Sequence, residues 1–228
     1  MAIWDDARVR RGMERQLELR ARMLDGGAQP IGWKLGLGTA AAMEALGTDG
    51  PLVGFLTDRT LLRPGATVAL AGWTNPMLEC EIAVRLGRDV PGDADRDAAA
   101  AAVDAVAPAI ELADVAGPRD DPEAILAGDV FHRHVLLGDW DTARAGLVLD
   151  GVTLGVDGVV EGADPQAVTG DLAELVRHTA AALAAFGERL RAGDAIITGA
   201  AIAPLPVAPG DAVACRFAGL GTLGVTLS

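Results

Sequence analysis

The pattern of apolar and polar positions predicts helices at two places and strands over much of the rest of the chain. Residues 3–25 carry apolar side chains at helical spacing and run into Gly26-Gly27, so a helix is expected to end there. The segment 170–190, "GDLAELVRHTAAALAAFGERL", predicts a long amphipathic helix that Gly187 terminates. The segments after it predict strands only.

A strand with one buried face is the clearest signal in the middle of the chain. In residues 78–86, "LECEIAVRL", every second residue is apolar, as in a half-buried strand. Residues 95–115 begin as a helical, alanine-rich run and are expected to become extended after Pro108, and residues 147–162 carry two Asp-Gly pairs that predict a hairpin. Strands outnumber helices without regular alternation, so the predicted class is α+β.

Composition and charge exclude several classes of partner. The chain has 228 residues and a net charge of −13, so it offers no basic face to nucleic acid. No apolar run approaches the roughly 20 residues that span a bilayer, and no signal peptide is recognised. Cys80 and Cys215 lack CxxC spacing, so neither a disulfide framework nor a zinc site is expected. We therefore expect a cytoplasmic protein with no membrane or nucleic-acid partner.

Lys34 is the only lysine among the nineteen Lys and Arg residues, and it lies in the apolar, glycine-rich stretch "IGWKLGLG". Two interpretations are open. An Ala-, Gly- and Arg-rich chain can keep one lysine by chance, or the position needs an ammonium that can lose its proton, which a guanidinium does not do. The glycines of this stretch match a dinucleotide-binding fingerprint, but the expected βαβ units around it are missing, so we reject that interpretation.

Three glutamates form the strongest candidate site. Glu79 and Glu81 stand at i and i+2 in the alternating strand, so both project from one face, about 6 to 7 Å apart. Glu111 lies among apolar residues in "APAIELAD". The pair alone fits a solvent-facing strand edge equally well. Three carboxylates brought together repel one another unless a cation lies between them, and an all-oxygen ligand set suits Mg²⁺ or Mn²⁺.

From about residue 31 to the end, the chain resembles the 2-keto-4-pentenoate hydratase branch of the fumarylacetoacetate hydrolase superfamily, which also contains 4-oxalocrotonate decarboxylases. The landmarks that carry the resemblance are, in order, "GWKLGL", "GFLTD", "NPMLECEIAVRL", "VAPAIELAD", "GERLRAGDAIITGA" and "APGDAVACRFAGLGTLGVTL". The resemblance implies a mixed β-roll or sandwich core with flanking helices. We accordingly expect an N-terminal helical segment (residues 1–30) and one catalytic domain (residues 31–228) in a single compact unit.

The resemblance also implies roles for particular residues. A divalent cation would be held by Glu79, Glu81 and Glu111, and Lys34 and Asp58 would be catalytic. Candidate substrate contacts are Leu78, His132, Thr198 and Gly199. The family likeness further suggests a homo-oligomer.

The chain departs from the family pattern at two places near the expected substrate. Met77 stands where the family usually has Arg or Lys, which suggests a substrate with fewer or differently placed carboxylates. "GDVFHRH" replaces a stretch of small polar residues, and its bulkier side chains are expected to reshape the pocket. His132 and His134 are open to acid–base, metal-adjacent or ordinary packing roles.

The function implied is a metal-dependent hydratase that acts on a small 2-hydroxy-2,4-dienoate or 2-oxo-enoate acid, as in meta-cleavage catabolism of aromatic compounds. In that reaction Lys34 and Asp58 would move the protons. The alternatives are a 2-oxo-enedioate decarboxylase and an acylpyruvate-type C–C hydrolase, for which a histidine–acid pair would activate water. A non-catalytic partner subunit is the alternative of another class.

Overall fold

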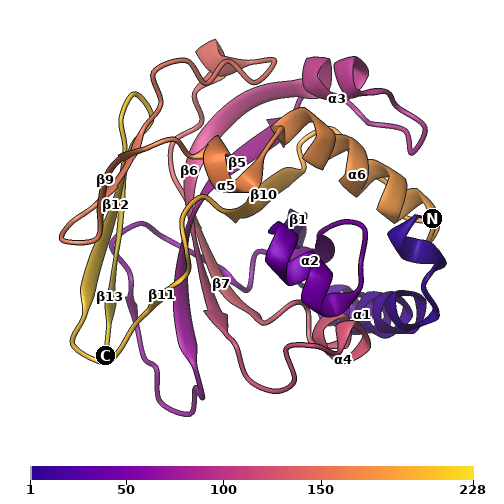
Figure 1. The fold of residues 1–228 in the computed structure, drawn as a ribbon, viewed down its shortest axis with the longest axis horizontal. Helices are drawn as coiled ribbons and strands as arrows, with labels where there is room; N and C mark the ends of the chain where they lie inside the picture. Colours follow the sequence, from indigo (N-terminus) through magenta and orange to yellow (C-terminus); the bar gives the residue numbers. More distant parts are fainter. Residues whose placement is uncertain (1) are drawn as a thin grey trace.

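The structure is a computed structural model and describes residues 2–228. Its helices are α1 (Ala7–Asp25), α2 (Ala40–Leu46), α3 (Arg96–Ala102), α4 (Pro122–Ala127), α5 (Gln166–Thr169) and α6 (Leu172–Ala184), with 3₁₀ turns at Ile3–Asp5 and Thr142–Arg144. Figure 1 shows strands in the middle of the molecule, a second sheet on the left and most helices on the right. No helix in the described part of the chain is long and apolar enough to cross a membrane.

Within residues 2–228, thirteen strands form two sheets. The larger sheet contains β1 (Pro30–Gly36), β2 (Leu52–Thr57), β3 (Leu61–Leu62), β5 (Pro76–Leu86), β6 (Val103–Asp114), β7 (His132–Leu137), β10 (Ala195–Ala200) and β11 (Leu205–Pro206). The smaller contains β4 (Thr67–Val68), β8 (Leu154–Val156), β9 (Val160–Ala163), β12 (Ala212–Phe217) and β13 (Gly221–Leu227). The strand orders are β2-β1-β10-β5-β6-β7-β3, with β11 beside β5, and β4-β13-β12-β8-β9. Parallel and antiparallel pairs are mixed, which confirms the α+β class.

The long antiparallel pair β5–β6 lies at the centre of the larger sheet. Its register runs from Pro76 opposite Asp114 to Leu86 opposite Val103. The expected change from helix to strand is confirmed, but its position is not. β6 begins at Val103, five residues before Pro108. The alanine run favours a helix, yet Val103 and Val106 are buried between packed layers, so tertiary packing decides where the helix ends.

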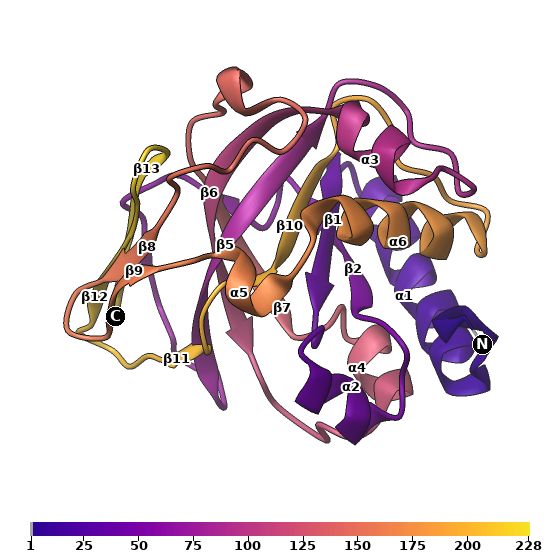
Figure 2. The same ribbon diagram turned by 45° about the horizontal axis from the view of Figure 1, so that its top comes forward.

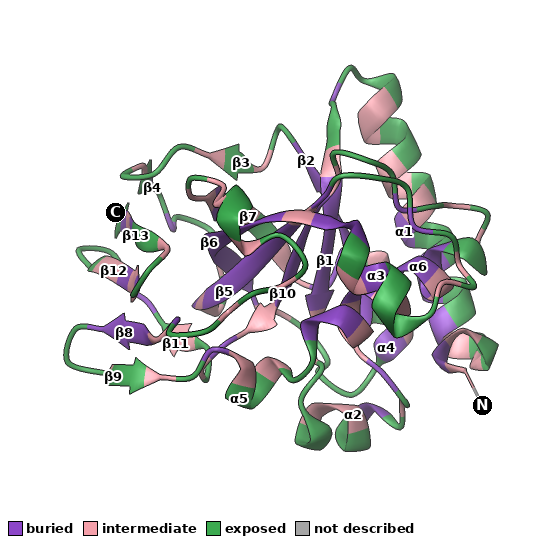
Figure 3. Ribbon diagram, turned by 90° about the horizontal axis from the view of Figure 1, so that it is seen from above, coloured by how far each residue is buried: buried purple, intermediate pink, exposed green. Residues whose placement is uncertain are grey.

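The two faces of the larger sheet meet different surroundings. One face packs against the smaller sheet and against α6 in a single apolar core; Figure 2 shows α6 lying across β10 and β1. This core includes Trp33 from β1, Ile82 from β5, Val176 from α6 and Phe217 from β12. The strands β1, β5 and β6 are buried along most of their length, whereas β9 and α2 are largely exposed (Figure 3).

A disulfide joins Cys80 of β5 to Cys215 of β12, with a Cα–Cα distance of 6.2 Å and a sequence separation of 135. The expectation of no disulfide is therefore wrong. Sequence spacing detects only local cysteine pairs, and this pair is created by the packing of one sheet on the other. The cysteines consequently no longer argue for a reducing compartment.

The N-terminal segment packs against the sheet instead of standing apart. Asp6 caps α1 by accepting a hydrogen bond from Arg8 N, and β1 begins at Pro30, at the expected boundary. On the inner face of α1, Gln16 is fully buried and donates from Nε2 to the Val53 carbonyl of β2 at 3.0 Å. The helix thus supports the strand that lies beside β1.

Candidate metal centre and active site

The three predicted glutamates meet on the second face of β5 and β6. The register puts Glu79 directly opposite Glu111, and Glu81 follows two residues along β5 on the same side. One carboxylate oxygen from each lies within 4.8 Å of the others. Glu81 and Glu111 are fully buried and Glu79 is partly exposed, so the cluster opens to solvent on the side of Glu79.

The buried oxygens of this cluster lack partners. Glu81 Oε1 and Glu111 Oε2 make no hydrogen bond with residues 2–228. Burial is the larger cause and repulsion from Glu111 the second. Together they raise the pKa of Glu79 to about 7 and the pKa of Glu81 well above its usual range. Buried, unpaired carboxylate oxygens that converge on one point fit a hard divalent cation, which neutralises them and replaces the missing hydrogen bonds.

Lys34 of β1 reaches the same cluster. Its Nζ donates to Glu111 Oε1 at 2.5 Å and to the Val130 carbonyl at 3.0 Å, and the residue is 2% exposed. Burial alone would lower the pKa of Lys34, but Glu111 and Glu79 outweigh it and raise the pKa above the usual value. Burial would likewise raise the pKa of Glu111, yet Lys34 and His132 lower it. Lys34 is therefore an ammonium paired with an ionised Glu111.

Two residues that the sequence did not point to hold Lys34 in place. Gly54 of β2 pairs with Lys34, and a Cβ at Gly54 would lie 2.7 Å from Lys34 Cγ and 2.9 Å from Asp129 Oδ1. Only glycine leaves room there for both side chains. Asp129 Oδ1 accepts hydrogen bonds from Phe55 N at 2.8 Å and Gln16 Nε2 at 3.3 Å, and burial raises the pKa of Asp129 well above its usual range.

The segment that supplies Asp129 is conformationally unusual. Asp129, Val130 and Phe131 have φ values of 57°, 52° and 64°, three consecutive non-glycine residues in the left-handed region. A β-branched residue such as Val130 is rarely found there, and strain of this kind is concentrated at functional sites. Here it directs the Val130 carbonyl towards Lys34 Nζ.

His132 positions Glu111. Its Nδ1 lies 2.7 Å from Glu111 Oε1 and its Nε2 lies 3.0 Å from Thr60 Oγ1. Burial lowers the pKa of His132, so the ring is neutral; because an ionised carboxylate only accepts, Nδ1 carries the proton. His134 instead stacks on Trp73, with ring centroids 6.0 Å apart, and half-buried packing fits it best.

Thr198 and Gly199 form a bulge in β10, where one extra residue separates the pairs Ile197–Ala83 and Ala200–Glu81. The bulge lets Gly199, at φ 94°, donate from its backbone N to Glu81 Oε2 at 2.7 Å. The Thr198 hydroxyl donates to the Ile82 carbonyl at 2.9 Å. Both predicted residues border the site, and Gly199 orients one of its glutamates.

The structure does not bring Leu78 or Asp58 to the cluster. Leu78 is fully buried in the apolar core, because strand alternation turns its side chain to the face opposite Glu79. Asp58 is exposed and accepts a hydrogen bond from Gln29 N at 2.8 Å. It lies four residues beyond Gly54, about 13 Å along the strand direction from the lysine. The structure therefore places neither residue at the cluster, and substrate contact for Leu78 and catalysis for Asp58 stay predictions.

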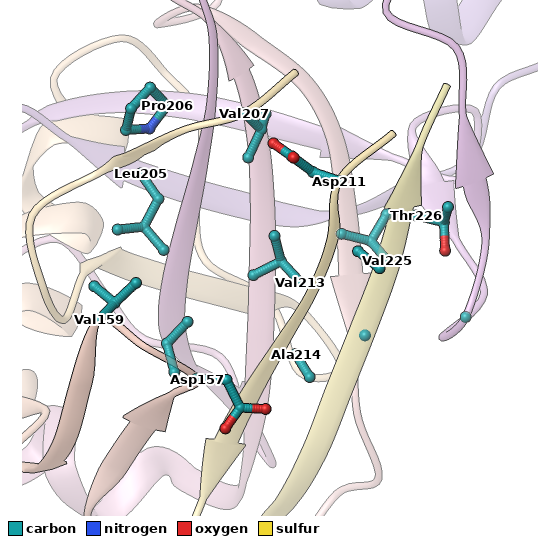
Figure 4. Close-up of a pocket in the computed structure, with 14 residues that line it drawn as sticks. Asp157, Val159, Leu205, Pro206, Val207, Asp211, Val213, Ala214, Val225 and Thr226 are labelled. Atoms are coloured by element: carbon teal, nitrogen blue, oxygen red, sulfur yellow. The ribbon is translucent and has the colours of Figure 1, made fainter. Parts of the chain in front are cut away.

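Two cavities open beside the cluster and share Glu79, Gly36, Leu37 and Pro204 as lining residues. One, of about 280 Å³, extends towards Thr198 and Gly199. The other, of about 150 Å³, extends towards Lys34 and Phe131. A larger cavity of about 510 Å³ lies away from the cluster, between β11 and the smaller sheet (Figure 4). Its labelled side chains are mostly aliphatic, with Asp157 and Asp211 as its carboxylates, so it offers no comparable chemistry.

The fold and the site together define a class of protein: a mixed α/β fold in which three buried or half-buried carboxylates converge beside a buried lysine. Comparison with known proteins places the chain within it. The family model described as "Fumarylacetoacetate (FAA) hydrolase C-terminal" matches residues 35–228, so the chain belongs to the fumarylacetoacetate hydrolase family.

Individual relatives agree with this assignment. A 4-oxalocrotonate decarboxylase of Pseudomonas sp is 32% identical over 224 residues, which cover 96% of this chain and 87% of the relative. A 2-keto-4-pentenoate hydratase of Paraburkholderia xenovorans is 30% identical over 212 residues, covering 89% and 77%. The solved 4-oxalocrotonate decarboxylase of Pseudomonas putida G7, complexed with magnesium and adipate, superposes with a TM-score of 0.83 at 31% identity, covering 93% and 83%. The predicted family and fold are confirmed.

Proposed function

We propose that the protein is a divalent-metal-dependent hydratase that acts on a 2-hydroxy-2,4-dienoate or 2-oxo-enoate acid, as in meta-cleavage catabolism of aromatic compounds. The observation that carries the proposal is the contact between the Lys34 ammonium and Glu111 in a cluster of three converging carboxylates. Relatives with hydratase and decarboxylase names share this fold over most of their length.

Glu79, Glu81 and Glu111 would hold the cation, with Mg²⁺ or Mn²⁺ as the expected ions. When bound, such an ion supplies Lewis-acid polarisation of the substrate's carboxylate and 2-oxygen. Gly199 N fixes the orientation of Glu81, and His132 fixes that of Glu111. The protein therefore holds two of its three metal-binding groups in place before any ion arrives.

Lys34 is the proton carrier in this proposal. Its Nζ lies at the cluster, 2.5 Å from Glu111 Oε1, so it is placed to exchange a proton with a substrate bound there. Asp129 lies beside Gly54, the cross-strand partner of Lys34, and we expect this buried carboxyl to support the lysine. Leu37, Val130 and Phe131 line the cavity beside Lys34 and keep water away from the reacting carbons.

Decarboxylation of a 2-oxo-enedioate is the second candidate, because the decarboxylase relatives cover up to 96% of this chain. C–C hydrolysis is less well supported. Both ring nitrogens of His132 are engaged, with Glu111 and Thr60, so this histidine does not offer a free base to activate water. A non-catalytic partner subunit would have no need for the complete set of Lys34 and three glutamates.

The experiment is product analysis of the purified protein with Mg²⁺ or Mn²⁺. Incubated with 2-hydroxypenta-2,4-dienoate, it is expected to yield the hydrated 4-hydroxy-2-oxo acid. Incubated with 2-oxohex-3-enedioate, release of CO₂ would instead support the decarboxylase. Thermal stabilisation by Mg²⁺, enhanced by oxalate, tests the metal site independently of turnover. No stabilisation and no turnover would favour the partner-subunit alternative.

Lys34→Arg tests the mechanism within this assay. Arginine keeps the positive charge next to Glu111 but does not give up its proton, so the variant is expected to fold and bind Mg²⁺ while kcat falls about 10²- to 10⁴-fold. The metal-dependent shift in melting temperature serves as the control for folding. Wild-type kcat in Lys34→Arg would exclude the proposed role.

A further inference from the structure

The cavity of about 150 Å³ beside the metal centre contains one charged group that the proposed chemistry does not use. Lys34 and Glu79 line it, and so does Arg119, from the loop between β6 and α4. Lys34 is committed to Glu111, whereas the described part of the chain contains no ion-pair or hydrogen-bond partner for Arg119. In a chain with 32 acidic residues, a guanidinium left unpaired at the wall of the active-site cavity is available to a ligand.

The sheet geometry gives the direction in which this cavity runs. Met77 and Ala113 are cross-strand partners one step beyond the Glu79–Glu111 pair, on the same face, and both line the cavity. Each step of two residues is about 6 to 7 Å, and Val115, which also lines the cavity, follows directly after the end of β6. The cavity therefore extends from the carboxylates towards the end of β6, where the loop that carries Arg119 begins.

The lining changes in character along this path. Lys34 and Glu79 line the cavity at the cluster, Met77, Ala113 and Phe131 add apolar side chains, and Arg119 adds a cation from the loop after β6. This order suits a small acid whose first carboxylate and 2-oxygen lie at the metal centre, whose carbon chain crosses the apolar stretch, and whose far end is a second carboxylate. A guanidinium binds a carboxylate through two parallel hydrogen bonds, which an exposed methyl or vinyl end does not offer.

We propose that Arg119 binds the distal carboxylate of a dicarboxylic 2-oxo acid and so determines a preference for diacid over monoacid substrates. This inference rests on the proposed function for the reaction at the other end of the cavity. Met77, which lines the same cavity, carries no charge, so Arg119 is the lining group placed to pair with the distal carboxylate.

The test compares substrate pairs of similar carbon skeleton with and without a distal carboxylate, such as 2-oxohex-3-enedioate and 2-oxohex-3-enoate, in wild type, Arg119→Gln and Arg119→Lys. In Arg119→Gln, kcat/KM for the diacid is expected to fall about 10- to 100-fold, the usual effect of losing a charge-assisted hydrogen bond, while kcat/KM for the monoacid stays within about threefold. Arg119→Lys should recover part of the diacid preference. Arg88→Gln, which changes an exposed arginine just beyond the other end of β5, is the matched control and should leave both values unchanged.

A binding measurement separates this inference from the proposed function. With Mg²⁺ present, adipate should raise the melting temperature of the wild type more than hexanoate does, and Arg119→Gln should lose that difference. This result is expected even if neither 2-oxo acid is converted. Equal stabilisation of the wild type by adipate and hexanoate, or an unchanged diacid preference in Arg119→Gln, would overturn the role of Arg119.

Discussion

Strand β5 carries two unlike surfaces on alternating residues. Cys80 and Ile82 face the apolar core between the sheets, where every neighbour is satisfied by packing or by the disulfide to Cys215. Glu79 and Glu81 face the other way, where burial leaves carboxylate oxygens without partners and raises the pKa values. The first face stabilises the folded protein. On the second face, buried carboxylates repel one another and destabilise it, and a bound cation would offset that repulsion. Substitutions at neighbouring positions should therefore have opposite consequences.

Glu81→Gln should give the largest effect on activity and little loss of stability. The amide keeps an oxygen for the hydrogen bond from Gly199 N but removes the buried charge and one metal ligand. We expect kcat to fall at least about 100-fold, and the melting temperature without metal to stay equal or rise. Steady-state kinetics and calorimetry with and without Mg²⁺ check both. A metal-free protein that melts much lower than wild type would contradict the contrast between the two faces.

Ile82→Ala, at the next residue, should show the reverse. Its fully buried side chain packs in the apolar core, so its truncation should lower the free energy of unfolding by about 2–5 kcal/mol. The kcat of the folded fraction should remain near the wild-type value, since the carbonyl that accepts from Thr198 Oγ1 is retained. Urea unfolding and kinetics at a temperature where the variant is folded measure the two quantities. Loss of kcat without loss of stability would show that the faces are coupled.

Removal of the disulfide should act on stability alone. Cys80 and Cys215 close a loop across 135 residues, so replacing both by alanine should cost about 2–4 kcal/mol. Mg²⁺-dependent stabilisation should persist, because neither sulfur lies on the glutamate face. The wild type in reducing agent is the matched control and should resemble the double variant. If reduction leaves the unfolding curve unchanged, the disulfide does not form in solution.

Part of the glutamate cluster could be predicted because its signals are local. Period-two alternation put Glu79 and Glu81 on one side, and the apolar context of Glu111 indicated burial. What surrounds them depends on long-range packing that a single sequence does not reveal. Gly54 and Asp129 come together only because β2 pairs with β1 and the left-handed segment turns back onto it.

Asp58 and the two cysteines also show that a single sequence does not reveal which distant residues come together. The position of Asp58 in "GFLTD" suggested catalysis, but the end of β2 carries it away from Lys34. The cysteines lack any local pairing signal, yet the two sheets bring them together. Strand class and alternation followed from the chain, whereas the exact helix ends and the contacts between elements distant in sequence did not.

The pH dependence of metal binding is the smallest effect expected, and it probes the glutamate face without mutation. Burial raises the pKa of Glu79 from 4.5 to about 7, so the folded protein without metal holds a proton that the unfolded chain has already lost. The protonated Glu79 therefore leaves the folded state at full stability below about pH 4.5, and this contribution to the free energy of unfolding is lost as pH rises through about 7. Mg²⁺ requires ionised ligands, so stabilisation by Mg²⁺ should grow over the same interval. Melting temperatures with Mg²⁺ or chelator between pH 5 and 8 measure this, and Glu79→Gln should flatten the profile. An Mg²⁺ shift of equal size across that range would mean that Glu79 is ionised throughout, and the glutamate face would then not carry the electrostatic cost that distinguishes it from the core.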